Sequence, residues 1–289
     1  MRARPGYYAP ETEPTGLPAV PGAETGAGAA MQALRSPLPV NGLTLQAFAT
    51  PFQGTAGRTW VLIGALLRGA DLTLDAEDRI EFAYLTIDTK GTVSPGAQQV
   101  FTLNLRDETR AAVSAGGFQY LEAIDVPPGR HEIRLVAHQP GGNTGSIVTH
   151  VDVPEFSDEP LTLSGILLTS PATTVDRTLE GDAPLAELFP NPPTARRRFA
   201  RTDAVAAYVE VYAEDGIRPD EIRLTATLMT ARQSRLRQDA GARLTNGDGR
   251  TGYTVTLPLD GLEPGEYLWR LEARAGRRTA SREIFLSVE

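Results

Sequence analysis

The sequence predicts an all-β protein built from two consecutive sandwich domains. Glycine and proline are frequent, at 28 and 22 of 289 residues, and both favour turns and short strands. Short segments alternate between apolar and polar residues, as strands with one buried face do, and helical periodicity is almost absent. A turn-plus-strand pattern also occurs twice, at residues 128–138 and 264–274, so we expect the chain to fold twice in the same way.

The first domain is expected over residues 37–153, behind a mostly disordered leader at 1–36. The leader is rich in Gly, Pro, Ala and Glu, a composition that buries too little apolar surface to fold alone. The run at 59–67 is apolar on both faces, which predicts a central strand that is covered on each side. The strands of this domain are predicted at residues 43–48, 59–67, 80–87, 100–105, 128–138 and 146–153.

The second domain is expected over residues 161–289, after a linker at 154–160. The linker is polar, has Pro at both ends and follows a completed strand, as domain boundaries commonly do. A strong turn signal, Asn-Gly-Asp-Gly, occupies 246–249. The strands of this domain are predicted at residues 161–168, 205–212, 222–228, 253–259, 264–274 and 284–288.

Two segments interrupt the strands. One helical turn is expected at 107–115, where Asp107 could cap the free N–H groups and Gly116-Gly117 could end the turn. Residues 170–198 form a long irregular excursion in the second domain. A loop of that length is unusual inside a compact domain, so we expect it to be functional or mobile.

The repeated pattern predicts a structural corner in each domain. Pro264 and Gly265 suit a tight turn, and Tyr267 follows at the start of the penultimate strand. Immunoglobulin-like sandwiches place a tyrosine at this position, and its hydroxyl binds back to nearby backbone. In the first copy the turn is Pro128-Gly129, and His131 takes the place of the tyrosine. We therefore expect two immunoglobulin- or fibronectin III-like sandwiches.

Several segments, in this order, resemble the C-terminal region of the von Willebrand factor A-related proteins abundant in acidobacteria and their relatives. These segments are residues 2–10, 36–40, 154–157, 161–170, 193–199 and 264–267, of which 2–10 resembles the last strand of the family's A domain. The resemblance implies a β-sandwich pair downstream of an A domain, in a protein that is exported. The A domain's metal motif, Asp-x-Ser-x-Ser, does not occur here, so the family's adhesion site is not carried over.

Composition and motifs argue against several classes of function. A net charge of −8 and a pI near 5.1 disfavour nucleic-acid binding, and the absence of Cys excludes disulfides and thiolate sites. No run reaches the ~18 apolar residues of a membrane helix, and the first residues carry no signal peptide. His131, His138 and His150 lack ligand spacing, with Asp152 the nearest further ligand, and no Gly-x-Ser-x-Gly elbow occurs. We therefore expect no enzyme activity, no metal and no cofactor.

The run Arg196, Arg197 and Arg198 is a candidate interaction site. It could bind an anionic polymer, or guard a sheet edge and pair with local acids such as Glu187. The aromatics Tyr208 and Tyr212 could form a contact patch, although core or inter-domain packing is the ordinary role of such residues.

The function expected from the sequence is a non-catalytic spacer or protein-interaction module of an exported or surface-associated bacterial protein. Its partner is expected to be a protein of unknown identity, and the oligomeric state stays open. The alternative is a polymer- or carbohydrate-binding module, which would require exposed aromatics in a line on one sheet.

Overall fold

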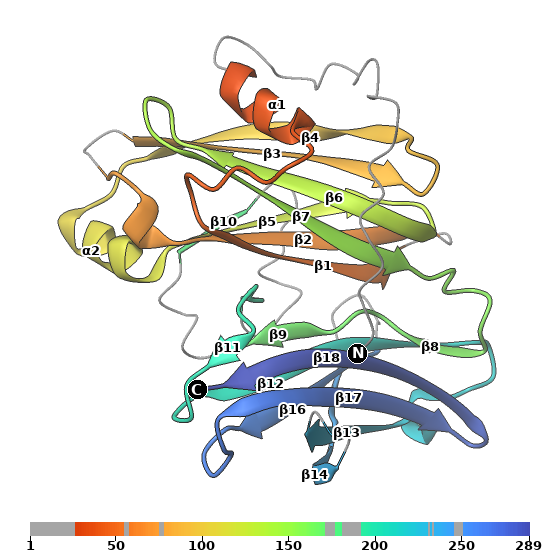
Figure 1. Ribbon diagram of the computed structural model, residues 1–289. Coiled ribbons are helices and arrows are strands. Elements are labelled where there is room, and N and C mark those ends of the chain that lie inside the picture. Colours follow the sequence, from red (N-terminus) through yellow and green to blue (C-terminus); the bar gives the residue numbers. More distant parts are fainter. Residues whose placement is uncertain are drawn as a thin grey trace, which may run out of the picture.

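The computed structural model describes residues 27–54, 58–74, 78–170, 177–180, 192–230, 232, 234–245 and 251–289. These residues form two β-sandwiches, one above the other in Figure 1, and the all-β class predicted from the sequence is confirmed. Neither of the two α-helices in this part of the chain is long and apolar enough to cross a membrane.

The first sandwich consists of two four-stranded sheets. One has the order β4 (Val93–Leu103), β3 (Asp78–Asp88), β6 (Gly129–His138) and β7 (Thr144–Val153); the other has β1 (Leu45–Gln53), β2 (Thr59–Leu67), β5 (Phe118–Asp125) and β10 (Arg177–Glu180). Neighbouring strands are antiparallel except β10, which runs parallel to β5. Alternate apolar residues of both sheets meet in the core, where the rings of Phe82 and Tyr120 stack with centroids 4.6 Å apart.

The second sandwich consists of two five-stranded sheets. One sheet has the order β11 (Arg198–Phe199), β18 (Arg278–Val288), β17 (Gly265–Ala275), β13 (Arg223–Thr230) and β14 (Arg235–Ala240); the other has β15 (Ala242–Thr245), β16 (Thr251–Pro258), β12 (Ala204–Ala213) and β8 (Leu161–Leu163), with β9 (Leu167–Thr169) also on β12. In the letters used for immunoglobulin- and fibronectin III-type sandwiches, β18, β17 and β13 correspond to strands G, F and C, and β8, β12 and β16 correspond to strands A, B and E. Trp269, 1% exposed, is the largest side chain in the core.

The order of the first sandwich explains the excursion at 170–198. In immunoglobulin-type sheets a strand D lies beside strand E, which corresponds here to β5. The chain forms helix α2 (Asp107–Gly116) between β4 and β5 instead, and β10 occupies the edge beside β5. The excursion was expected to be a loop of the second domain; its β10 belongs to a sheet of the first, because the edge of β5 offers unpaired backbone groups.

Helix α1 (Ala27–Arg35) differs from the disordered leader that composition predicted. Ala30, Ala33 and Leu34 are spaced on one helical face and are buried against β3 and β6. A helix this short gains its stability from such packing and little from propensity, so composition alone does not reveal it. Residues 1–26 of the predicted leader lie outside the described residues.

Helix α2 lies where a helical turn was expected, although its ends differ in detail. Arg106 is the N-cap residue and makes no side-chain capping bond, while Asp107 lies in the first turn. A carboxylate there still favours the helix through the partial positive charge of the N-terminus. Gly117 ends the helix with φ of 118°. Two short 3₁₀ turns, Gly69–Asp71 and Pro219–Glu221, complete the helical elements of the described chain.

The two sandwiches pack against each other through apolar side chains. The outward face of the sheet β1-β2-β5 contacts β9, β12 and the segment before β11. The cluster consists of Phe48, Phe52, Leu62, Leu66, Leu121, Leu167, Ala195 and Tyr208. The expectation that residues 59–67 form a strand covered on both faces is thereby confirmed, and the second cover is the other sandwich.

Candidate functional site

The predicted corners hold equivalent hydrogen bonds in the two sandwiches. The Tyr267 hydroxyl donates to the carbonyl oxygen of Glu263 at 2.5 Å, four residues earlier. The His131 Nε2 lies 2.9 Å from the carbonyl oxygen of Pro127, also four residues earlier. Because a carbonyl only accepts, Nε2 must carry the proton in this contact. Both side chains are buried, so each corner ties the start of its strand, β6 or β17, to the turn before it.

The turns before these corners are not identical. In the first corner, Gly129 has a φ of 127°, in the region that favours glycine, which agrees with the tight turn predicted at Pro128-Gly129. Gly265 is not among the positive-φ glycines of the described chain; there the left-handed residue is Gly261, with φ of 81°. Near this corner the positive φ therefore occurs before Pro264 and not at the glycine that follows it.

The three arginines predicted as one interaction site point to different surroundings. The Arg196 guanidinium reaches the carbonyl of Gly116 in the first sandwich at 3.5 Å. The Arg197 guanidinium donates to the carbonyls of Thr194 and Arg196, at 3.0 and 2.8 Å. Burial lowers the pKa of Arg197 to about 10, so the side chain still carries its charge at neutral pH. Only Arg198 is exposed; Glu187 lies outside the described residues.

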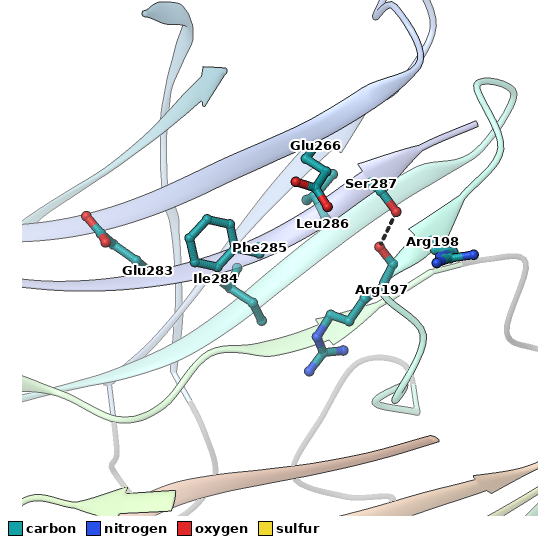
Figure 2. A pocket seen from close by; sticks show the side chains of 8 residues that line it. All are labelled: Arg197, Arg198, Glu266, Glu283, Ile284, Phe285, Leu286 and Ser287. Carbon is teal, nitrogen blue, oxygen red and sulfur yellow. Dashed lines mark hydrogen bonds between the residues drawn. The ribbon is translucent and has the colours of Figure 1, made fainter. Parts of the chain in front are cut away.

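A shallow open groove of about 690 Å³ lies beside Arg197 and Arg198, at the edge of β18. Figure 2 shows the two arginines on one side of it and Glu283, Ile284 and Phe285 along the strand on the other. The Phe285 ring is 68% exposed, although it stands on a sheet. No sequence pattern described above predicts this groove. The one indication in the sequence is Phe285, an apolar residue on the otherwise polar face of residues 284–288.

A buried carboxylate lies close to the contact between the sandwiches. Glu210 of β12 is 3% exposed and accepts hydrogen bonds from the hydroxyls of Tyr208 and Tyr212, at 3.2 and 2.6 Å. The Tyr212 hydroxyl also accepts from the backbone N–H of Gln53 in the first sandwich, at 3.0 Å. Tyr208 and Tyr212 thus serve inter-domain packing, the ordinary role weighed from the sequence.

The histidines do not converge on one point. The His138 Nδ1 lies 2.8 Å from the Thr144 hydroxyl, and His150 lies 3.8 Å from Glu132, while His131 is buried in its corner. Within the described ranges, no three His, Cys, Asp or Glu side chains are grouped so as to hold a metal ion.

Comparisons with known proteins identify no family. No family model matches the chain, and no curated protein matches it. Among solved structures, a β-glucuronidase from Parabacteroides merdae aligns at 9% identity and a TM-score of 0.27, over 83% of this chain and 28% of that one. A putative β-galactosidase from Bacteroides fragilis aligns at 11% identity and a TM-score of 0.29, over 80% and 32%. A Salmonella α2-macroglobulin mutant aligns at 16% identity and a TM-score of 0.26, over 86% and 15%.

This chain thus spans a third or less of the length of these proteins. Likenesses with TM-scores this low carry no information about its function.

Proposed function

We propose that this chain is a non-catalytic module that holds two sandwiches in a fixed relative orientation and serves as a spacer or protein-interaction unit. The observation that carries the proposal is the apolar contact between the sandwiches. Contacts between domains of one chain are usually polar and permit relative motion, whereas a large hydrophobic contact does not. Here Phe52 and Leu62 of one sandwich and Tyr208 of the other are all at most 2% exposed.

Close backbone packing supports the same interpretation. The N–H of Gly165, between β8 and β9, donates to the carbonyl of Pro51 in β1 at 2.8 Å. A Cβ atom added at Gly165 would lie 2.6 Å from Thr50 Cγ2 and 2.7 Å from Pro51 Cδ, closer than such atoms approach. The backbones of the two sandwiches therefore meet without an intervening side-chain layer at this point.

The connectivity adds covalent constraint. The chain passes from β7 to β8, returns from β9 to β10, and crosses again from β10 to β11. Three crossings limit relative rotation more than one linker would. The expected linker at 154–160 is therefore only the first of these connections.

The setting of the module is inferred from the resemblance to von Willebrand factor A-related proteins, which favours an exported or surface-associated bacterial protein. The alternative of a polymer- or carbohydrate-binding module finds less support. Phe285 is the one exposed aromatic ring in the part of the chain that the structure describes, so no line of aromatics is present there.

Unfolding and solution scattering test the fixed orientation. For the wild type we expect one cooperative unfolding transition and a scattering curve that a single rigid body fits. Leu121→Arg, in the inter-domain cluster and 1% exposed, should split the transition and increase the radius of gyration. Val100→Arg, at a site 56% exposed, is the matched control and should do neither. A wild type that unfolds in two independent steps, or whose scattering requires several orientations, would overturn the proposal.

A further inference from the structure

Among the described residues, one edge of strand β18 has no backbone partner before residue 287. On one side the strand pairs continuously with β17. On the other, β11 pairs with it only at residues 287–288, where the N–H of Ser287 donates to the carbonyl of Arg197 at 2.8 Å. Figure 2 shows Arg197 beside this end of the strand.

The free edge presents backbone groups that can accept another strand. Because successive residues of a strand direct their N–H and C=O groups to opposite sides, Phe285 and Glu283 face the same edge as Ser287. The register of β18 with β17 has no shift, so this alternation is unbroken. No backbone group within the described ranges pairs with this side of Phe285 or Glu283.

The groove adds an apolar contact to these backbone groups. It runs along this edge, and the exposed Phe285 ring lies in it. A peptide added as a strand gains main-chain hydrogen bonds from an edge and specificity from alternate side-chain contacts. The edge of β18 offers both within one short stretch.

The charges at the β11 end favour an acidic ligand. The nearest guanidinium contacts of Arg197 are carbonyl oxygens, and Arg198 has no ion pair with any described residue. Glu283 is already paired with Arg270, whose Nε donates to it at 2.6 Å. Of the groove's groups, only Glu266 opposes the two arginines.

We propose that the free edge of β18 binds an extended acidic peptide of a partner protein as an added strand, with a carboxylate at the end of the peptide that meets Arg198. This inference rests on the interaction role proposed above and names the chemistry of the partner. The added strand hydrogen-bonds to Glu283 and Phe285, packs on the Phe285 ring and stops where β11 begins.

A second copy of this chain fits the edge less well. If two β18 strands paired antiparallel, the early residues of each would run into the position that β11 of the other occupies. Only a few residues on each strand could then pair. The size of the protein in solution separates this occupant from a peptide.

A short synthetic peptide that alternates Val and Thr and ends in two Asp residues serves as the probe, with the same peptide ending in two Lys residues as its control. Fluorescence anisotropy measures binding to the full chain, and amide NMR shifts locate it. We expect the acidic peptide to bind and to shift the amide signals of Glu283 and Phe285. Its affinity for the protein should exceed that of the lysine-ended control peptide by roughly fivefold or more.

Three variants refine the test. Arg198→Glu should weaken binding of the acidic peptide by roughly fivefold or more. Arg277→Glu, an exposed arginine in the turn before β18, is its matched control and should leave binding unchanged. Phe285→Pro removes both the outward N–H and the aromatic ring but leaves the ladder to β17 intact, as Pro does on edge strands, and should abolish binding.

The outcomes are decisive in either direction. No binding up to about 1 mM, or equal binding of both peptides or both arginine variants, would overturn the proposal. A dimer that disappears in Phe285→Pro would overturn it in favour of a second copy. Circular dichroism establishes that each variant is folded, and Arg198→Glu changes only a surface side chain. The fixed orientation of the sandwiches is measured separately by scattering, so either idea can fail while the other stands.

Discussion

The hydroxyl of Tyr212 links the two sandwiches, and Tyr212→Phe removes only this group. The ring contact with Phe156, at 5.0 Å between centroids, is retained. The variant deletes the donor to the buried Glu210 carboxylate and the acceptor for the Gln53 N–H. A hydrogen bond to a charged group is worth about 1.5–3 kcal/mol and a neutral one about 1 kcal/mol, and losses within one network overlap. We therefore expect a loss of roughly 2–3 kcal/mol in the free energy of unfolding.

Urea denaturation followed by tryptophan fluorescence measures this loss. Tyr253→Phe is the matched control, because its hydroxyl donates to a neutral carbonyl, that of Ile222, at 3.3 Å. It should cost about 1 kcal/mol or less. A double variant with Glu210→Gln should cost less than the sum of the single changes, since both act on one network. A Tyr212→Phe loss below about 0.5 kcal/mol, or one equal to that of Tyr253→Phe, would refute the assigned role of the hydroxyl.

Three further changes have defined outcomes. Tyr267→Phe removes the corner hydrogen bond and should lower the unfolding free energy by about 1 kcal/mol, measured by urea denaturation; an unchanged midpoint would contradict the corner's contribution. Gly165→Leu forces a side chain against Thr50 and Pro51 and should destabilise the protein by roughly 1–3 kcal/mol and loosen the contact in scattering, whereas Gly91→Ala, in open space but at positive φ, should leave the scattering curve unchanged. Burial raises the pKa of the Glu81 carboxyl above its ordinary value of 4.5, so the folded state holds this proton to higher pH than the unfolded chain does. The free energy of unfolding that the protonated Glu81 contributes therefore falls as pH rises from 4.5 through the folded pKa. Glu81→Gln should remove that fall, and parallel stability curves for variant and wild type between pH 4 and 7 would contradict it.

Alternation and turn signals predicted most strands, because each sandwich is built from strands with one buried and one outer face. The corner residues could also be read from the repeat, and His131 makes the same contact to residue i−4 as Tyr267 does. The run at 59–67 even indicated that β2 has a second cover. The segment that covers it could not be predicted, because apolar side chains on an outer face do not specify which part of the chain packs against them.

The missed features depend on contacts between distant segments. Helix α1 needs the surface of β3 and β6 to form, and β10 needs the free edge of β5. The arginine run is contiguous in sequence, which predicts a single patch, but residues that are neighbours in sequence need not share the same surroundings. Irregular backbone at 192–197 instead directs Arg196 to the first sandwich and leaves Arg198 at the groove.

The position of β10 has a consequence for synthesis and for dissection of the chain. During translation, the first sandwich has one sheet edge unfilled until residues 177–180 emerge, after β8 and β9 of the second sandwich have already been made. A fragment that ends at residue 153 would therefore expose β5 to other chains, as open edges generally do. The first sandwich therefore cannot be moved as one continuous segment without losing β10, whereas the second keeps all of its own strands and carries β10 between β9 and β11.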